Sequence, residues 1–411
     1  MNILYLSQYF PPEIGATQNR AYENAHHLIK SGHKVTVICE IPNHPSGIIN
    51  PDYRGKFIVR SNWDGIDVIR VWVKASPIKS FLNRMLFYIS YMINATIAGI
   101  FIARGSYDLI YVTSPPLFVG GAGLVIKILR QIPMIFEVRD LWPDSAVILG
   151  ELKNPTAITL AKKLEQTCYK RAALIVVVTE GIRQILLRKG LPNENVIVIP
   201  NGTKLSRYQF DAKGRENIRR QLSLEKKFVA IYAGIHGIAQ GLEIIIQAAK
   251  SLETQSQIHI LMVGDGPQKA MLKQMVSTFE LRNVTLHNEV SMDEIPNYLS
   301  AADIALIPLK DIDLFNYALP SKMFDAWACQ RPIALLVNGE ARTVMEEAQA
   351  GVFVPPESPE LLAEALIKLQ ESPDDLQRMG INGRKYVEEH FSREVLAEKL
   401  LHELEHLLGD T

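Results

Sequence analysis

Cysteine is scarce in this sequence of 411 residues, and its placement excludes two common uses of the residue. Cys39, Cys168 and Cys329 lie far apart and never form a Cys-x-x-Cys pair, so they make neither a disulfide framework nor a set of zinc ligands. This usage favours a reducing compartment, and we expect a cytoplasmic protein.

The sequence also lacks an excess of charge. Lys plus Arg and Asp plus Glu both total 44. Without a global basic field, the composition predicts no nucleic acid partner. The first residues, MNILYLSQYF, have no basic region ahead of their apolar residues and no small-residue cleavage site. They therefore predict a first β-strand rather than a signal peptide.

Residues 86–103, LFYISYMINATIAGIFIA, carry no charge at all. This length lies at the lower edge of what a transmembrane helix needs. A spanning helix and a buried helix of an α/β domain are both open interpretations. We favour a third, a helix that dips an aromatic face into the inner surface of the plasma membrane, as a peripheral protein does. That face would consist of Phe81, Phe87, Tyr88 and Tyr91, with Lys79 and Arg84 beside it.

The length exceeds what one hydrophobic core supports, which predicts two domains. Short apolar runs such as NILYLS, KVTVIC and ALIVVVT alternate with amphipathic helices, and in a helix near 17–31 Ala21, Ala25 and Leu28 share one face. Such alternation is typical of doubly wound α/β domains with a mainly parallel sheet. The alternation lapses after PNG at 200–202 and resumes with FVAIYAG.

The predicted organisation therefore has four parts. They are an N-terminal domain at 1–200, a linker at 201–226, a second domain at 227–390 and a C-terminal helix at 391–411 that packs back on the domains. Two Rossmann-like domains of this kind would face each other across a cleft and bind ligands at the carboxyl ends of their strands.

Two short patterns could indicate a metal, but a surface location is the better interpretation of both. HELEH at 402–406 matches a zinc-protease motif, yet it lies on the polar side of a leucine-faced helix. The Asp-x-Asp at 311–313 matches a motif that holds a divalent ion in metal-dependent sugar transferases, although such a short pattern often occurs by chance. We expect no metal.

Two glycine-rich turns each join an apolar strand to a helix. YAGIHGIAQGLE at 232–243 contains no Arg or Lys, but its glycines let the backbone approach a ligand, and the following helix offers free N–H groups to a phosphate. GDGP at 264–267 follows the strand ILMV in the same way. GGAG at 120–123 instead lies inside a predicted helix, where close packing explains it better than dinucleotide binding.

Two further segments carry candidate chemistry. In PSKMFDAWACQRP, Ser321 and Lys322 lie in the first turn of a predicted helix, where an anion is favoured, although a capped helix with a solvated lysine is also open. In FEVRDLWPDSAV, Arg139 and Asp140 directly follow a strand. They form either a structural ion pair or a site whose carboxylate orients an acceptor hydroxyl.

Taken in order, these segments resemble the family-four glycosyltransferases of the GT-B fold over nearly the full chain, and especially the subgroup that makes bacterial surface polysaccharides, which includes O-antigen N-acetylfucosamine transferases. The similar segments are YFPPEIGATQNRAYENAHHLIKSGHKVTVIC, VIPNG, YAGIHGIAQGLEIIIQAA, ILMVGDGP, PSKMFDAWACQRPIA and GVFVPPESPELLAEAL.

The resemblance implies a retaining, metal-independent transfer of a sugar, an N-acetylated hexosamine or deoxyhexosamine, from a UDP-sugar. The acceptor would be a polyprenyl-diphosphate-linked saccharide bound by the N-terminal domain, with the donor in the C-terminal domain and no cofactor. It implies catalytic roles for Gly15 and Asp140, to which we add Lys322. Acceptor contacts would come from Glu13, Arg139 and Trp142. Donor contacts would come from Gly234, His236, Gln240, Gly241, Gly264, Asp265, Gly266, Ser321 and Asp325.

At three positions the chain lacks a charged residue of the family pattern. Tyr317 stands where members have a Glu, Ile235 where they have an Arg, and Gln240 where they have a Lys. We expect Lys322 to replace the missing cations at the diphosphate. The departures leave open a non-catalytic nucleotide-sugar-binding subunit, and the fold leaves open an epimerase. His236 could donate a hydrogen bond to the donor or be a packed or solvated histidine.

Overall fold

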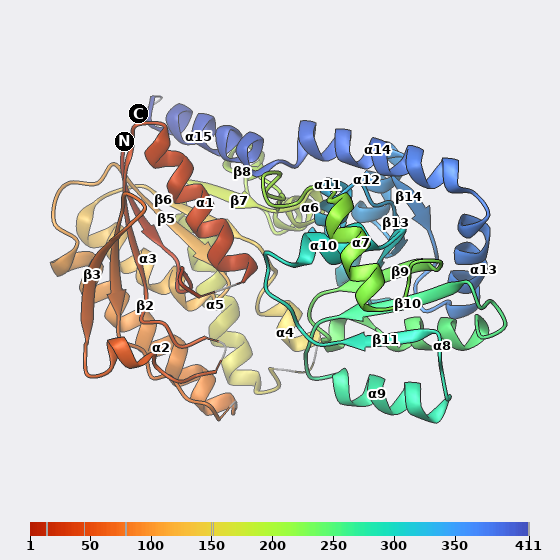
Figure 1. Cartoon of the computed structure of the whole chain (residues 1–411). Coiled ribbons are helices and arrows are strands. Elements are labelled where there is room, and N and C mark those ends of the chain that lie inside the picture. The colour runs from red at the N-terminus through yellow and green to blue at the C-terminus, as the bar shows by residue number, and fades with distance from the viewer. Residues whose placement is uncertain (14, 45, 79, 149, 151, 410–411) are drawn as a thin grey trace. The chain divides into compact units, whose positions relative to one another are not determined.

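The chain forms two compact units in a computed structural model that describes all residues except 14, 45, 79, 149, 151 and 410–411 (Figure 1). The first unit is Met1–Ile199 with Ala397–Thr411, and the second is Pro200–Leu396. Each unit contains one largely parallel sheet, so the predicted pair of doubly wound α/β domains is confirmed.

The sheet of the first unit has eight strands in the order β3-β4-β2-β1-β5-β6-β7-β8. They are β1 (Asn2–Leu6), β2 (Lys34–Glu40), β3 (Ile58–Trp63), β4 (Ile66–Val71), β5 (Leu109–Ser114), β6 (Met134–Val138), β7 (Leu174–Val177) and β8 (Val196–Val198). All pair in parallel except β3, which is antiparallel to β4 at the sheet edge. The strands β1 and β5 are almost wholly buried, as their continuous apolar runs predict for the centre of a parallel sheet.

The helices of the first unit follow the predicted alternation. They are α1 (Ala16–Lys30), α2 (Phe81–Ile97) with its π-helical continuation Ala98–Ile102, α3 (Phe118–Arg130), α4 (Asp144–Ile148), α5 (Pro155–Arg171) and α6 (Glu180–Arg188). The face of α1 that carries Ala21, Ala25 and Leu28 is buried, as predicted. The GGAG glycines lie within α3, and a Cβ on Gly123 would meet Val112 of β5 at 2.6 Å, so they serve packing.

The second unit has six parallel strands in the order β11-β10-β9-β12-β13-β14. They are β9 (Phe228–Ala233), β10 (Ile258–Val263), β11 (Val284–His287), β12 (Ile304–Pro308), β13 (Ile333–Leu336) and β14 (Gly351–Phe353). Its helices are α7 (Ala212–Gln221), α8 (Glu243–Ser251), α9 (Lys269–Thr278), α10 (Ile295–Ala301), α11 (Ser321–Ala328), α12 (Glu340–Ala348), α13 (Pro359–Gln370) and α14 (Pro373–His390).

The segment predicted as a linker, 201–226, belongs to the second unit and contains α7. Arg215 and Arg219 of this helix both form ion pairs with Asp303, at 2.6 and 2.7 Å. Asp303 also accepts a hydrogen bond from the backbone N–H of Val229 at 2.7 Å, at the start of the sheet. The charged side chains of this segment therefore attach it to the second unit by ion pairs, and the segment is not a solvated linker.

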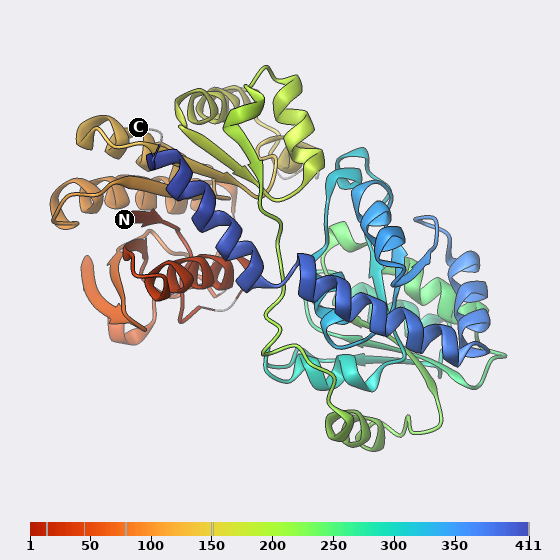
Figure 2. The ribbon, with the colours of Figure 1, turned by 90° about the horizontal axis from the view of Figure 1, so that it is seen from above.

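The predicted end of the second domain at 390 also needs correction, because the unit continues to Leu396. The N–H of Thr203 donates to the carbonyl of Phe391 at 2.9 Å, and the Arg393 guanidinium donates to the carbonyl of Gly202 at 3.1 Å. The last helix, α15 (Arg393–Gly409), lies beside α1 in the first unit (Figure 2). There His27 of α1 contacts Glu398 at 3.1 Å.

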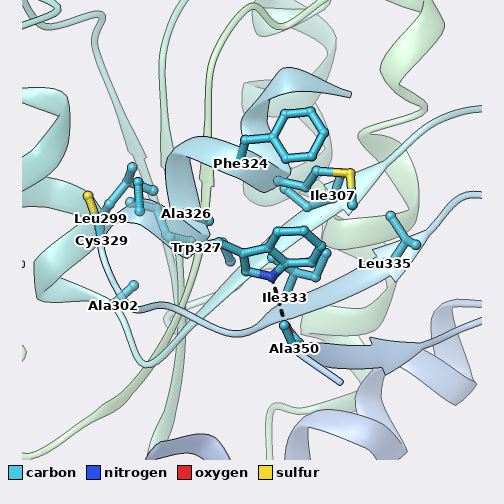
Figure 3. Packing of buried hydrophobic residues seen from close by; sticks show 14 of the residues in the cluster. Leu299, Ala302, Ile307, Phe324, Ala326, Trp327, Cys329, Ile333, Leu335 and Ala350 are labelled. Carbon is cyan, nitrogen blue, oxygen red and sulfur yellow. Dashed lines mark hydrogen bonds between the residues drawn. The ribbon is translucent and has the colours of Figure 1, made fainter. Parts of the chain in front are cut away.

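Helix α11 is anchored in the core of the second unit by Trp327 and Phe324, which are fully buried (Figure 3). The Trp327 indole N–H donates to the carbonyl of Ala350 at 2.9 Å, so this side chain leaves no polar group unsatisfied. The packing fixes the rotation of α11 and thereby the positions of its polar residues Lys322 and Asp325.

Candidate functional site

Two predicted donor loops of the second unit pack directly on each other. Gly264 and Gly266 have φ values of +146° and +153°, and a Cβ on either residue would collide with the backbone of Gly234 or His236. The N–H of His236 donates to the carbonyl of Asp265 at 2.8 Å. The glycines therefore allow a backbone contact between the loops that no side chain would permit.

The side chain of Lys322, in the first turn of α11, places its ammonium group at the same loops. A Cβ on Gly234, whose φ is +145°, would lie against Lys322 Cε and 3.0 Å from Lys322 Nζ. Lys322 is half-buried, and Nζ lies 5.7 Å from the centre of the Tyr232 ring. Within the described part of the chain, no carboxylate oxygen lies within 4.0 Å of this ammonium. Burial lowers the pKa of Lys322, although Asp325 acts in the opposite direction.

His236 lies beneath the loops and is fully buried. Its two ring nitrogens have no hydrogen-bond partner among the described residues. Burial first, and then the charge of Lys269, lowers its pKa to about 4, so the imidazole is neutral at physiological pH. The carbonyl of His236 accepts the N–H of Gln268 at 2.9 Å, so the residue also holds the start of α9 through its backbone.

Gly241 ends the first glycine-rich loop in the left-handed region, at φ +57°. It brings the loop against Lys310, whose Cγ would lie 3.2 Å from a Cβ on Gly241. Lys310 follows the carboxyl end of β12, donates its N–H to the carbonyl of Ala239 at 3.0 Å and pairs loosely with Glu243 at 3.9 Å. This second cation was not among the predicted donor residues, although its position after the strand run IALIP is a signal for a ligand contact.

The other predicted donor residues have different surroundings. Ser321 starts α11 as expected. The Asp325 carboxylate accepts a hydrogen bond from the Thr203 hydroxyl at 2.6 Å. Tyr317, which replaces the first Glu of the family pattern, ends a short 3₁₀ turn at 313–317. A ribose hydroxyl at Asp325 would therefore share that carboxylate with Thr203.

In the first unit, Gly15 precedes α1 directly, as the resemblance implies, with its backbone extended. Glu13 is buried, and its Oε1 accepts the N–H groups of Asn43 and His44 at 2.6 and 2.7 Å. Burial raises its pKa, while these two donors and Arg70 lower it. Glu13 thus holds the loop after β2, a scaffold contact that the predicted acceptor role did not include.

Arg139 is also held within the scaffold. Its guanidinium donates to the hydroxyl of Thr17 at 3.0 Å and to the carbonyl of Pro115 at 3.2 Å, and it lies 3.8 Å from Glu137. Neither of the interpretations of Arg139, an acceptor contact or an ion pair with Asp140, describes these contacts.

Glu137, which the sequence analysis did not single out, lies at the centre of this network. It pairs with Arg20 at 2.9 Å and accepts the hydroxyls of Tyr111 at 2.8 Å and Thr113 at 2.6 Å. Although burial alone raises its pKa, Arg20 and Arg139 lower it below the usual range. This buried carboxylate connects α1 to β5 and β6. A single Glu in an otherwise apolar strand is the sequence signal from which a buried, paired carboxylate could have been predicted.

Asp140 and Trp142 remain at the surface of the first unit, half-buried, after the carboxyl end of β6. Asp140 Oδ2 accepts the hydroxyl of Ser145 at 2.8 Å. The Trp142 ring lies 6.2 Å from the ring of Phe118. Asp144 instead starts α4 and pairs with Lys162 at 3.0 Å.

The predicted aromatic membrane face of α2 is wrong in one respect. Tyr91 is fully buried, and its hydroxyl donates to the carbonyl of Ile38 at 2.9 Å. Lys79 lies outside the described residues. The outward side chains form a row that we call the apolar face, which consists of Leu82, Leu86, Ile89, Ile93, Ile97 and Phe101. Sequence periodicity could not separate the two sides because both are apolar.

The segment Phe81–Ile102 is long and apolar enough to cross a membrane by length and composition, with a mean hydropathy of 1.7, and 22% of it is buried. No cluster of three or more metal-binding His, Cys, Asp or Glu side chains occurs in the described ranges, which include the HELEH and Asp-x-Asp motifs.

Comparison with known proteins matches both halves of the chain. Residues 15–202 match the family described as "Glycosyl transferase 4-like domain", and residues 214–386 match "Glycosyl transferases group 1". The putative colanic acid biosynthesis glycosyl transferase WcaI of Escherichia coli K12 is 26% identical over 79% of this chain and 80% of its own. The putative teichuronic acid biosynthesis glycosyltransferase TuaC of Bacillus subtilis is 25% identical over 90% and 89%.

Among solved structures, HepE of Anabaena in complex with UDP and glucose superposes with a TM-score of 0.73 at 17% identity, over 98% of this chain and 99% of that one, which shows a shared fold. Together the two family matches extend over most of the chain, and each coincides with one of its two α/β units. The chain therefore combines a glycosyl transferase 4-like domain in its N-terminal half with a group 1 glycosyl transferase domain in its C-terminal half, and it has the two α/β units of the GT-B fold.

Proposed function

We propose that this glycosyltransferase acts in surface polysaccharide synthesis and transfers a sugar with retention from a UDP-sugar to a lipid-linked saccharide. The names of WcaI and TuaC support the polysaccharide role, and the UDP complex of HepE supports the donor. The transferred sugar in this proposal is an N-acetylated hexosamine or deoxyhexosamine of the O-antigen type, and no metal takes part. The acceptor is linked to polyprenyl diphosphate.

The observation that carries the proposal is the Lys322 ammonium against Gly234, with no carboxylate within ion-pair distance among the described residues. A half-buried lysine without an anionic partner is costly in the absence of a ligand, because burial disfavours its charge. A diphosphate beside Gly234 would supply that anion, and the N–H groups at the start of α11 would add to its binding.

The proposed role of Lys322 in this arrangement is to stabilise the leaving phosphate. When the bond between the sugar and the diphosphate breaks, negative charge develops on the departing phosphate, and a cation fixed beside it stabilises the transition state more than the ground state. Lys322 takes this role in place of the family Arg and Lys that Ile235 and Gln240 have replaced. Lys310 adds a second positive charge at Gly241.

On the acceptor side, the proposed partner of the attacking hydroxyl is Asp140. Its carboxylate is half-buried and accepts a hydrogen bond from Ser145, which orients it without neutralising it. Arg139 and Glu13 act through the scaffold: Arg139 holds Thr17 in the first turn of α1, just after Gly15, and Glu13 holds the loop after β2.

The proposed location is the inner membrane surface, with α2 lying in the interface. The apolar face supports this part, since Leu82 and Phe101 near its ends are 65% and 70% exposed. Residues 71–107 contain four Lys or Arg and no Asp or Glu, which complements an anionic bilayer. The opposite side of α2 packs on β2 through Tyr91, so an interfacial position fits better than a spanning one.

A second candidate function is a subunit that binds a nucleotide sugar without turning it over. The three departures Ile235, Gln240 and Tyr317 favour it. One assay distinguishes the two functions. Purified protein is incubated with a panel of UDP-sugars and a lipid-linked acceptor, with and without EDTA. A glycolipid product that forms in EDTA supports the transferase and its metal independence. UDP-sugar binding without any product supports the subunit, and an epimerised UDP-sugar without acceptor would indicate the epimerase.

A further inference from the structure

Three aromatic rings of the first unit form a continuous row that ends at Trp142, two residues after Asp140 in the sequence. The rings of Tyr88 and Phe118 stack with their centres 5.8 Å apart and their planes at 20°. The rings of Phe118 and Trp142 follow at 6.2 Å and 58°. We call these three residues the aromatic row. It joins α2, the start of α3 and the loop after β6, and all three side chains are half-buried.

Polar groups border the row. Tyr9, which follows β1, is held by a hydrogen bond with Tyr88, and burial first, then Glu40, raises the pKa of Tyr9 well above its usual range. The His44 ring lies 5.4 Å from that of Tyr9, and Asp140 is two residues from Trp142. Ring faces and hydrogen-bonding groups therefore alternate along the carboxyl ends of β1, β5 and β6.

The row differs chemically from the apolar face on the same helix. Tyr88 is half-buried beside Phe118, whereas its neighbour Ile89 belongs to the exposed aliphatic side of α2. A hydrocarbon chain laid over the row would remove the half-buried Tyr88 hydroxyl and Asp140 carboxylate from water and form no hydrogen bonds with them, which is unfavourable. A saccharide can pack its C–H groups on the negative ring faces while its hydroxyls bond to these polar groups.

We propose that the aromatic row is a binding subsite for a pyranose ring of the acceptor saccharide, which it presents to Asp140, and that the lipid part of the acceptor is held elsewhere. This inference rests on the proposed function, because it assigns the acceptor side of the same reaction. It adds Tyr88 and Phe118 to the residues that select the acceptor, and it makes a carbohydrate, not its lipid carrier, the ligand that they recognise.

Binding can be measured without knowing the natural acceptor. The probes are octyl glucoside, octyl galactoside and octyl N-acetylglucosaminide below their micellar concentrations, with octyl phosphate as the sugar-free control. The readout is tryptophan emission, and Trp142→Phe identifies the part of the signal that comes from the row. Phe118→Leu should weaken binding of the best glycoside roughly two- to tenfold, which is what the loss of one ring contact is worth. Tyr88→Phe keeps the ring and should weaken it less.

A shift of Trp142 emission with a glycoside but not with octyl phosphate, reduced by Phe118→Leu at unchanged UDP affinity, supports the subsite. If no glycoside shifts that emission, or if octyl phosphate does so equally, the assignment is overturned. Transfer assays separate this from the proposed function. If wild-type protein forms product and Phe118→Leu leaves the acceptor KM unchanged, the subsite is wrong and the transferase stands. If glycosides bind to the row but no UDP-sugar yields product, the transferase has failed.

Discussion

The substitution Lys322→Met tests the assignment of the leaving-group cation. It retains the length and apolar stem of the side chain over Gly234 and Tyr232 but removes the charge. Losing one fixed electrostatic contact to a developing oxyanion costs about 3–4 kcal/mol, so kcat should fall by roughly 10²–10³. The affinity for the UDP-sugar should also fall, although less, because the intact donor carries less charge on the departing oxygen than the transition state does.

The same substitution should stabilise the unliganded protein at neutral pH. Burial lowers the pKa of Lys322 in the folded state, so the unfolded chain binds this proton more tightly. The folded state therefore carries an unfavourable contribution that is fully present below the lowered pKa and disappears as pH rises toward the ordinary lysine pKa. Methionine removes that contribution, and the Tm without ligand should rise.

The measurements are kcat and donor KM from glycolipid formation, UDP affinity by calorimetry, and thermal melts. Lys273→Met is the matched control, since this lysine is exposed on α9. Lys322→Ala should abolish transfer while Gln240→Ala only weakens it. A Lys322→Met protein that keeps kcat within about twofold of wild type would refute the electrostatic reasoning. The reverse ranking of Lys322→Ala and Gln240→Ala would show that Lys322 is not the cation at the leaving diphosphate.

Three further outcomes are expected. Asp140→Asn should lower transfer at least tenfold at unchanged UDP affinity, because a positioned carboxylate contributes roughly 10²–10⁴; equal loss of UDP binding would contradict an acceptor-side role. The double variant Leu86→Ser with Ile93→Ser should sediment less with anionic vesicles at unchanged Tm, whereas Tyr91→Ser should lower the Tm. If the double variant sediments as wild type does, the apolar face does not bind the membrane. His236 has a folded pKa of about 4, below its unfolded value, so its stabilising contribution should be present above about pH 6.5 and lost toward pH 4. In His236→Gln the free energy of unfolding should therefore change less with pH in that range. An unchanged pH dependence would contradict this expectation.

The sequence predicted the sheet-forming segments and the glycine-rich turns well, because both depend on local chemistry. Strands buried on two faces need continuous apolar runs, and Gly234 and Gly264 occupy backbone conformations that other residues avoid. It predicted the 201–226 segment poorly. A charged stretch resembles a linker until its partner is known, and Asp303, the partner of Arg215 and Arg219, is far away in sequence.

The face of α2 was beyond sequence reasoning for a related reason. Tyr91 and Ile93 are both apolar and only two positions apart, yet one is fully buried and the other is 51% exposed. Which side of a uniformly apolar helix packs on the sheet depends on the shape of the underlying strands, here on the carbonyl of Ile38 that the Tyr91 hydroxyl reaches. Hydropathy alone carries no information about that choice.

Charged residues at the carboxyl ends of strands are the hardest to interpret, and burial explains why. Glu13 and Arg139 lie where ligand contacts are expected, but Glu13 Oε1 and the two terminal guanidinium nitrogens of Arg139 already hold neighbouring segments. Breaking such contacts to reach a substrate would leave buried donors or acceptors unpaired, which costs more than a new surface contact returns. Asp140 and Lys322 are half-buried, and Lys322 lies beside the glycine-rich loop at Gly234. A ligand can therefore reach them without disrupting the scaffold, which makes them the residues on which transfer should depend.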